Sequence, residues 1–386
     1  MTSICLCMII KDESEVIERC LNSVKDLISH WVICDTGSSD GTRDLVHQVL
    51  GGVPGELHER PWIDFGHNRS EMLRLGRGKA QYLLLLDADW TFSAKPGALD
   101  GLKADAYLVR QRLPQGHGLE FYNRNLVRGD KSWRYVGVTH EYLDTKGKVS
   151  ERRLAGAQID NWGDGGVGRA KRWRQDAELL ERAVRKDPRN GRNVFYLAQT
   201  YRDLGEKRRA IDLYRRRAAM GGWAEEVFYS LYQIGVLFGQ LGNWDAAASA
   251  LVKAWKYRPT RIEPLHQLAT GYRLRQDYAN AHRYAVRALG KPEPPDILYV
   301  DSWIYRWGAL FEYSVSAYWT GEHAAALDAC DRLLERADLP PEYRTHVTQN
   351  RQFCLRALHG EGAAQESQQF AIRGGTVILR LPGQKS

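Results

Sequence analysis

The chain has 386 residues, 43% of them hydrophobic and 26% charged, with a net charge of +8, which is typical of a soluble globular protein of two to three domains. No apolar run approaches the roughly eighteen residues of a membrane-spanning helix, and the N-terminus lacks the basic segment of a secretory signal, so we expect a cytoplasmic protein. The six cysteines include no Cys-x-x-Cys pair, which favours free buried thiols over a disulfide framework.

The first 50 residues predict two strand–helix units. Residues 3–10 are apolar and predict a strand that ends in Lys11, Asp12 and Glu13, and the apolar spacing over 15–27 predicts a helix. Residues 31–34 predict a second strand, followed by a Gly/Ser turn over 35–42 that leads into a helix carrying Leu45. Alternating strands and helices indicate βαβ units and a mostly parallel sheet.

A buried strand that ends in two carboxylates follows. Residues 62–69 predict a loop that enters a helix over 70–76, and the apolar run 82–86 predicts a strand buried on both faces. Asp87 and Asp89 come directly after it. Alternating strand residues share a face, and like charges repel unless a cation lies between them. Oxygen ligands suit Mg²⁺ or Mn²⁺, and strand carboxyl ends bind ligands in α/β sheets, so we predict a metal site here.

The next segment predicts an antiparallel extension of the sheet. Residues 106–110 and 119–122 alternate like strands, and residues 133–142 place His140 and Glu141 beside an apolar strand. A Gly-rich turn over 161–166 closes this part of the chain. We therefore predict an α/β domain over residues 1–167.

From residue 168 onward the chain is helical and periodic. Four turn positions are each followed five residues later by an alanine, and the turns lie 37, 34 and 45 residues apart. These turn residues are Gly205, Gly242, Gln276 and Gly321, with Ala210, Ala247, Ala281 and Ala326. A helix-turn-helix period near 34 is that of tetratricopeptide repeats, which we predict over residues 168–358. Residues 359–386 form a tail, in which 376–381 permit a short strand.

Positive charge is concentrated in the middle of the chain. Between Lys103 and Arg217 there are 27 Lys and Arg against 15 Asp and Glu, an excess of 12. Such a segment suits a polyanionic partner or the phosphates of a nucleotide donor. Helices with solvated basic faces would give the same pattern.

The first 165 residues resemble the family-2 glycosyltransferases, which have the GT-A fold. The resemblance rests on Ile10-Lys11-Asp12-Glu13, on the segment from Asp35 to Thr42, and on Asp87-Ala88-Asp89, in order and at the ends of three predicted strands. It implies that Glu13 and Asp35 contact the base and ribose of a nucleotide-sugar, and that Asp87 and Asp89 hold it through a divalent metal. The resemblance implies a donor site, for which a UDP-sugar is expected, formed by Ile10, Lys11, Glu13, Asp35, Gly37, Asn68, Arg69, Asp87 and Ala88.

The segment around Glu141 departs from many family members. They carry a Glu-Asp pair followed by Gln-x-x-Arg-Trp, which is absent here. The sequence Val138-Thr139-His140-Glu141 instead resembles a subgroup of lipopolysaccharide-core transferases. The whole layout resembles a transferase–tetratricopeptide fusion, a plan that bacteriocin S-glycosyltransferases share.

Glycosyl transfer needs a cation for the departing diphosphate and a base for the acceptor proton. We predict Glu141 as the base, with Asp160 and Asp164 in reserve, and His140 as a third metal ligand. Adjacent strand residues point to opposite faces, so His140 and Glu141 can both serve the site only from a turn. The resemblance also implies inversion at the anomeric carbon.

The acceptor is open among three macromolecules. We lean to a hydroxymethylated base in DNA because of the basic segment; the alternatives are a polypeptide, which the repeats suit, and a glycan, which the His-Glu stretch suits. Near the domain junction, Trp162, Arg172 and Trp173 are candidates for contacting the acceptor. The alternative from another class is a non-catalytic adaptor whose repeats bind partners.

Overall fold

The computed structural model describes residues 2–114, 120–163, 169–296 and 298–360. The chain divides into two compact units, Met1–Asp187 and Pro188–Ser386. The first unit contains β1 (Ile4–Ile10), α1 (Ile17–Val24), β2 (His30–Asp35), α2 (Thr42–Leu50), β3 (Gly55–Glu59), α3 (Phe65–Gly76), β4 (Tyr82–Leu85), β5 (Trp90–Ala94), β6 (Ala106–Arg112), β7 (Glu120–Arg128), β8 (Trp133–Val136), β9 (Tyr142–Thr145), β10 (Glu151–Asn161) and α4 (Arg169–Lys186).

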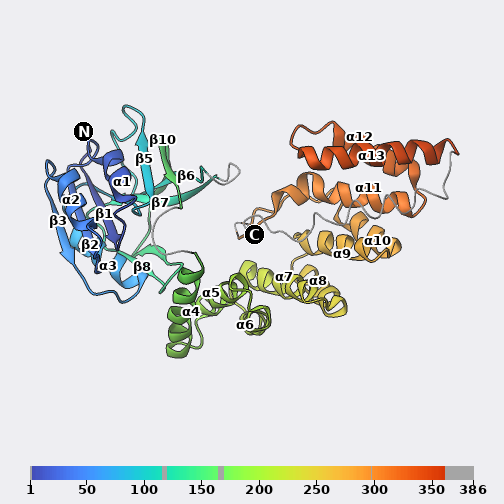
Figure 1. Ribbon diagram of the computed structural model, residues 1–386, viewed down its shortest axis with the longest axis horizontal. Helices are drawn as coiled ribbons and strands as arrows, with labels where there is room; N and C mark the ends of the chain where they lie inside the picture. The colour runs from blue at the N-terminus through green and yellow to red at the C-terminus, as the bar shows by residue number, and fades with distance from the viewer. Residues whose placement is uncertain (1, 115–119, 164–168, 297, 361–386) are drawn as a thin grey trace. The chain divides into compact units, whose positions relative to one another are not determined.

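The first unit is built on one mixed sheet (Figure 1). The strand order is β3-β2-β1-β4-β7-β6-β10-β5, and β8 pairs with β9 in a separate hairpin. The strands β3, β2, β1 and β4 are parallel, whereas β7 runs antiparallel to both β4 and β6. The predicted parallel βαβ half and antiparallel extension are therefore both present.

Both faces of the central strands are covered, which explains their continuous apolar runs. Alternate β1 residues, such as Leu6 and Met8, pack into a core with Ile17 and Leu21 of α1. The opposite face packs against α3 and the β8–β9 hairpin, as Met72, Leu73, Trp133 and Leu143 show. All six cysteines are buried and free, as expected.

Several local predictions need correction. The strand β4 ends at Leu85, so Asp87 and Asp89 lie in the turn after it and not on the strand. Helix α3 begins at Phe65 and not at residue 70, because the carboxylate of Asp64 accepts the backbone N–H of His67 at 2.7 Å and caps an earlier first turn. The prediction lacks strands β3 and β10, since their polar residues hide the strand pattern, and it also lacks the short strand β5.

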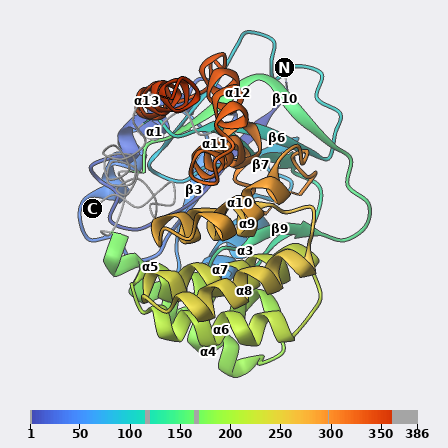
Figure 2. The ribbon, with the colours of Figure 1, turned by 90° about the vertical axis from the view of Figure 1, so that its right-hand side faces the viewer.

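The second unit is a stack of helix pairs (Figure 2). It contains α5 (Gly191–Asp203), α6 (Lys207–Ala219), α7 (Ala224–Gln240), α8 (Trp244–Tyr257), α9 (Glu263–Leu274), α10 (Tyr278–Ala288), the π-turn η1 (Ile304–Gly308), α11 (Ala309–Trp319), α12 (His323–Leu334) and α13 (Pro341–Leu358). The four predicted alanines are fully buried, which lets the paired helices approach closely; they are Ala210, Ala247, Ala281 and Ala326.

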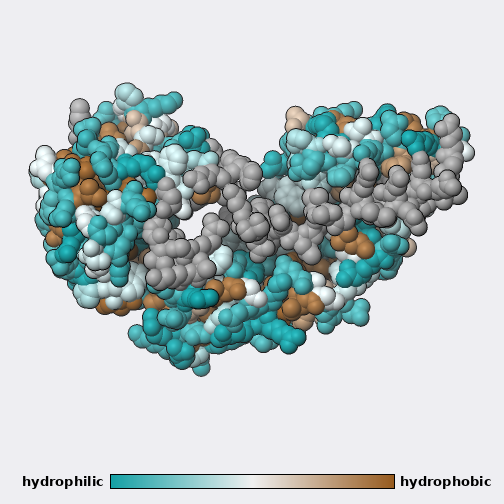
Figure 3. Space-filling model, viewed as in Figure 1, coloured by the Kyte–Doolittle hydropathy of each residue, from teal (hydrophilic) through white to brown (hydrophobic). Residues whose placement is uncertain are grey.

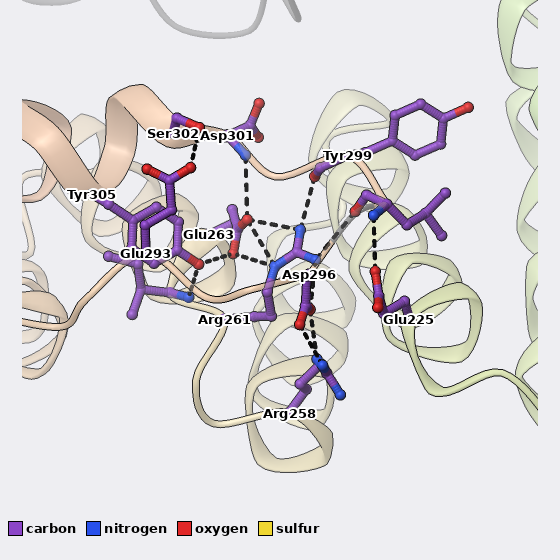
Figure 4. Close-up of polar contacts among 12 residues, drawn as sticks. Glu225, Arg258, Arg261, Glu263, Glu293, Asp296, Tyr299, Asp301, Ser302 and Tyr305 are labelled. Carbon is purple, nitrogen blue, oxygen red and sulfur yellow. Dashed lines mark hydrogen bonds and ion pairs between the residues drawn. The ribbon is translucent and has the colours of Figure 1, made fainter. Parts of the chain in front are cut away.

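The long third spacing between turns corresponds to an irregular segment between α10 and η1. Figure 4 shows how it is fastened: Arg261, which is buried, donates to the carboxylate of Asp296 at 3.1 Å and to the carbonyl of Tyr299 at 2.8 Å. Arg261 also pairs with Glu263 at 2.8 Å. Asp296 and Tyr299 of this segment are therefore held by hydrogen bonds to a buried arginine.

Helix α4, predicted within the repeat domain, belongs to the first compact unit. No helix among the described residues is both long and apolar enough to span a membrane. Figure 3 shows a mostly hydrophilic visible face on each unit, with apolar residues scattered among polar ones. The short strand considered at 376–381 lies outside the described residues.

Candidate donor and catalytic site

The loops that follow β1 and β2 are locked together. The backbone N–H of Asp12 donates to the hydroxyl of Ser38 at 3.0 Å, and the carboxylate of Asp12 accepts the N–H of Ser39 at 2.8 Å. Asp12 has a φ of 51°, a conformation that a non-glycine residue rarely adopts. Because parallel strands end at one edge of the sheet, both loops stand where ligands bind in such folds.

Asp35 is held inside its turn. Its side chain is 1% exposed and accepts the backbone N–H of Ser38 at 3.1 Å. Gly37 provides the turn with a φ of 107°, which favours glycine. The predicted base and ribose contact therefore stands on a rigid turn.

A second layer of bonds supports the neighbouring residues. The backbone N–H of Glu13 donates to the Thr42 hydroxyl at 2.8 Å, and that of Ser14 donates to Asp40 at 3.0 Å. Burial opposes ionisation of Asp40, but the hydrogen bonds from Thr42 and Ser14 outweigh it and lower its pKa. Ile10 is buried and its carbonyl accepts the N–H of Thr36 at 2.9 Å, whereas Lys11 is exposed.

Asn68 has a supporting place in the structure. Its side chain is fully buried, its Oδ1 accepts the N–H of Ile63 at 3.0 Å, and its Nδ2 donates to the carbonyl of Pro61 at 3.0 Å. The amide therefore holds the loop before α3, and a direct donor contact by Asn68 stays a prediction.

Arg69 joins two of the predicted carboxylates. One guanidinium nitrogen lies 2.6 Å from Asp87 Oδ1 and another lies 2.8 Å from Glu141 Oε1. The guanidinium also lies 5.6 Å from the centre of the Tyr135 ring. Burial alone would lower the pKa of Arg69, but the carboxylates of Asp87 and Glu141 outweigh it and raise the pKa, so the charge is held in place.

His140 and Glu141 both lie in the turn between β8 and β9, which meets the condition for both to serve one site. Glu141 is mostly buried against Arg69. His140 is exposed and has a φ of 50°. Sequence spacing alone did not predict the Arg69 bridge, since its two partners are 18 and 72 residues away.

Asp87 and Asp89 flank the buried Ala88 and both act on Cys20 of α1. The Cys20 thiol donates to the carbonyl of Asp87 at 3.5 Å. Burial raises the pKa of Cys20 well above its usual range, and the negative charges of Asp87 and Asp89 raise it further. The thiol is thereby kept protonated and is no nucleophile.

The two aspartates suit a divalent cation only in part. Mg²⁺ is commonly held by one or two carboxylates with substrate phosphates completing the shell, and this pair meets that requirement. Among the described residues, however, no group of three His, Cys, Asp or Glu side chains gathers to hold a metal. The ligand set Asp87, Asp89 and His140 therefore stays a prediction that depends on a bound donor.

The remaining candidates lie on β10 and α4. Asp160 forms an ion pair with Arg112 at 2.9 Å, and this pair shares no residue with the ion pairs of Arg69. The backbone N–H of Trp162 donates to the carbonyl of Asp89 at 3.3 Å, and its indole donates to the Thr91 hydroxyl at 3.1 Å, so Trp162 borders the aspartate pair. Trp173 is half-buried on α4, which also carries Arg172. Asp164 lies outside the described residues.

Comparison with known families supports both units. Residues 5–124 match the sequence model for Glycosyl transferase family 2, and residues 229–260 match one for a tetratricopeptide repeat. The first match covers most of the sheet of the first unit and the second lies in the helical repeats, so both agree with the predicted family-2 domain followed by repeats. The metal-binding and acceptor residues are outside what the matches test.

Three individual proteins illustrate the likeness. A TPR repeat-containing protein of Synechococcus elongatus is 30% identical over 171 residues, 42% of this chain and 40% of that protein. The SPbeta prophage-derived glycosyltransferase SunS of Bacillus subtilis is 23% identical over 235 residues, 54% of this chain and 51% of SunS. The chain thus spans 40% of the length of the first relative and 51% of the length of SunS. The crystal structure of S. aureus TarS 1–349 in complex with UDP-GlcNAc is 11% identical, with a TM-score of 0.37, covering 67% of this chain and 92% of that one.

Proposed function

We propose that this chain, a family-2 glycosyltransferase domain followed by tetratricopeptide repeats, moves a sugar from a nucleoside-diphosphate sugar to a macromolecular acceptor. The observation that carries the proposal is the Arg69 bridge, in which one buried cation meets Asp87 at 2.6 Å and Glu141 at 2.8 Å. The bridge joins the turn after β4 to the hairpin that carries the proposed base.

The donor would lie over the carboxyl ends of β1, β2 and β4. Glu13 and Asp35 would contact the base and ribose, for which a UDP-sugar is our first choice. The turn that carries Asp35 is already ordered by the hydrogen bonds from Ser38, so binding would order little additional backbone there. The diphosphate would face Arg69, whose positive charge is maintained by the carboxylates of Asp87 and Glu141 despite its burial.

In the transfer step the acceptor atom would bond to the anomeric carbon as the bond to the diphosphate breaks, with inversion. Glu141 would take the acceptor proton, and Arg69 would stabilise charge developing on the diphosphate oxygens. Asp87 and Asp89 would hold a Mg²⁺ or Mn²⁺ ion together with the donor diphosphate, and the ion would supply Lewis-acid stabilisation of the leaving group. His140, predicted as a third ligand, does not gather with them in a group of three among the described residues.

For the acceptor we propose a polypeptide. Helical repeats build extended surfaces that suit extended chains. The basic segment, which favours a hydroxymethylated DNA base, is partly paired locally: Arg112 pairs with Asp160, Arg134 with Asp144, and Arg217 with Glu226. Pairing leaves fewer cations for phosphates, so DNA becomes the alternative outcome of the test.

Release of nucleoside diphosphate from a panel of sugar nucleotides, with Mg²⁺ or Mn²⁺ and again with EDTA, tests the proposal. We expect metal-dependent release by the wild type and a loss of roughly 10²-fold or more in Asp89→Ala with the fold retained, the scale of losing transition-state charge stabilisation. Asp100→Ala, an exposed loop aspartate, is the matched control and should behave as wild type. No release with any donor would favour the non-catalytic adaptor, and release that EDTA leaves unchanged would remove the metal from the proposal.

A further inference from the structure

The loop of residues 137–141, between β8 and β9, delivers Glu141 to Arg69 in an unusual backbone conformation. Gly137 has a φ of 118° and His140 a φ of 50°. A non-glycine residue keeps a positive φ only when surrounding contacts determine it. The contacts that hold this loop are therefore part of what places Glu141.

Helix α3 holds the first half of the loop. The backbone N–H of Phe65 donates to the carbonyl of Val138 at 3.1 Å. A Cβ atom on Gly66 would lie 2.1 Å from the carbonyl oxygen of Gly137, so only glycine permits this approach of the helix to the loop backbone. These contacts end at Val138, before the strained residue.

Helix α4 holds the second half of the loop. The hydroxyl of Thr139 donates to Asp176 Oδ1 at 3.0 Å, and these residues are only 7% and 6% exposed. A hydroxyl bonded to a carboxylate is a charge-assisted hydrogen bond, which is stronger than a neutral one. This bond lies directly before His140 and two residues before Glu141.

We propose that Asp176 is a positioning residue for glycosyl transfer, holding Glu141 against Arg69 by fixing Thr139. The inference rests on the proposed function, because the place of Glu141 matters to catalysis only if Glu141 takes the acceptor proton. Without the bond to Asp176, Thr139 would lose a contact that fixes the backbone directly before His140, and Glu141 would be held less firmly against Arg69. Asp176 would act on the site through the hydrogen bond that its carboxylate accepts from Thr139.

Matched substitutions at Thr139 separate positioning from folding. Thr139→Val removes the hydroxyl at nearly constant volume, whereas Thr139→Ser keeps it. In steady-state transfer assays we expect Thr139→Val and Asp176→Ala to lower kcat by roughly 10- to 100-fold, as small misplacements of catalytic groups do, with donor KM changed less than about twofold. Thr139→Ser should stay close to wild type.

The double variant Thr139→Val/Asp176→Ala should lose no more than either single variant, because both changes break the same bond. The inference would be overturned if the kcat losses of the two single variants multiply in the double variant. It would also be overturned if Thr139→Val keeps a kcat within about twofold of wild type, or if the substitutions change KM instead of kcat.

A second measurement does not depend on activity. Amide hydrogen exchange of peptides covering residues 134–142 should speed up in Thr139→Val and Asp176→Ala of the full chain, but not in Thr139→Ser, while β1 peptides stay unchanged. Unchanged exchange in that segment overturns the inference. A wild type that releases no nucleoside diphosphate defeats the proposed function instead, and the exchange result then still decides whether Asp176 holds the loop.

Discussion

Arg69 connects two carboxylates of the candidate site, so a change at any one of these three side chains alters the others. Its guanidinium forms ion pairs with both Asp87 and Glu141, so the position of each carboxylate depends on this one cation. Removing either carboxylate leaves a buried charge with half of its compensation. Substitutions here must therefore preserve shape if they are to report on chemistry.

Glu141→Gln preserves that shape and removes the basic oxygen. We expect donor binding to remain nearly intact and the transfer rate to fall by about 10²–10⁴, the usual effect of losing a general base. Single-turnover transfer with a saturating donor measures this. Glu151→Gln, on β10 and paired with Arg124, is the control and should not change the rate. Wild-type turnover by Glu141→Gln would move the role of base to Asp160.

Gln276 shows a different single-residue effect in the repeats. The equivalent turns use Gly205, Gly242 and Gly321, with φ of 81°, 78° and 86°, and Gln276 adopts 62° in the same place. The left-handed region costs a non-glycine residue about 1–2 kcal/mol.

We therefore expect Gln276→Gly to raise the free energy of unfolding of the repeat unit by about 0.5–1 kcal/mol, after the extra entropy of glycine in the unfolded chain is subtracted. Urea denaturation followed by circular dichroism measures this. Gly242→Gln is the reverse control and should destabilise. A destabilised Gln276→Gly would mean that the glutamine side chain contributes contacts worth more than the backbone strain.

At the scale of elements, neighbouring helix pairs are joined by buried ion pairs as well as by apolar packing. Arg217 at the end of α6 donates to Glu226 in the first turn of α7 at 2.8 Å, and both are almost fully buried. Arg273 of α9 pairs with Glu312 of α11 at 2.8 Å in the same way. Each pair connects one repeat to the next.

Arg217→Ala should destabilise the repeat unit by about 3–5 kcal/mol, because it leaves the Glu226 carboxylate buried without its main partner. Arg215→Ala, two residues earlier, is the control: its side chain is 57% exposed and pairs with Asp212 at 3.4 Å. That surface pair contributes about 0–1 kcal/mol. Equal losses in the two variants, measured by chemical denaturation, would contradict the distinction between buried and exposed pairs.

The irregular segment before η1 makes the same unit sensitive to pH. Burial, together with the nearby charge of Glu263, raises the pKa of Asp301 to about 6. Figure 4 shows Asp301 beside this group of bonds. Between about pH 4 and 6 the folded protein binds more protons at Asp301 than the unfolded chain does, so its contribution to stability falls as pH rises and stays low above pH 6.

Asp301→Asn should therefore stabilise the protein at pH 8, and the gain should shrink as pH falls through 6 and vanish near pH 3–4. Thermal unfolding of both proteins across this range tests the sign. Asp328→Asn, an exposed residue of α12, should show no comparable trend. A gain that grows toward low pH would contradict the raised pKa of Asp301.

At the scale of the whole molecule, two compact units share one chain, and their chemistry differs. The first unit carries the carboxylates and the arginine bridge, whereas the second carries repeats whose basic residues are partly buried in ion pairs. Under the proposed function, the repeats would recognise a macromolecular acceptor and the first unit would modify it. The class of acceptor then determines how binding responds to salt.

For a polypeptide acceptor we expect no tight binding of duplex or single-stranded DNA by the full chain at physiological salt. Filter binding at two salt concentrations tests this, since a DNA partner would lose about 0.9 log units of affinity per tenfold salt for each phosphate neutralised. Charge reversal of the exposed Arg215 and Arg216 should leave transfer unchanged, as should reversal of Arg283 and Arg287 outside the basic segment. Tight, steeply salt-dependent binding that only the first pair of changes removes would favour DNA.

Local physics determined a large part of this protein from its sequence. Continuous apolar runs such as 82–86 predict strands with two covered faces, and this prediction needs no long-range information. The turn residues and the buried alanines of the repeats follow from period and size alone, so the repeated helix pairs could be predicted from the sequence, although not the place of α4 or the irregular segment before η1. The position of Asp87 and Asp89 directly after a buried strand can likewise be read from the sequence, and the metal site there stays a prediction.

Only the tertiary structure decided which charges meet. Arg69 pairs with residues 18 and 72 positions away, and Thr139 bonds to Asp176 37 positions away, at distances where sequence spacing carries no geometric information. Arg217 looks like a surface cation among Arg215 and Arg216 until packing buries it against Glu226. The polar residues of β3 and β10 do not by themselves favour a strand. These strands form because the neighbouring strands β2 and β6 supply hydrogen-bond partners for their backbones.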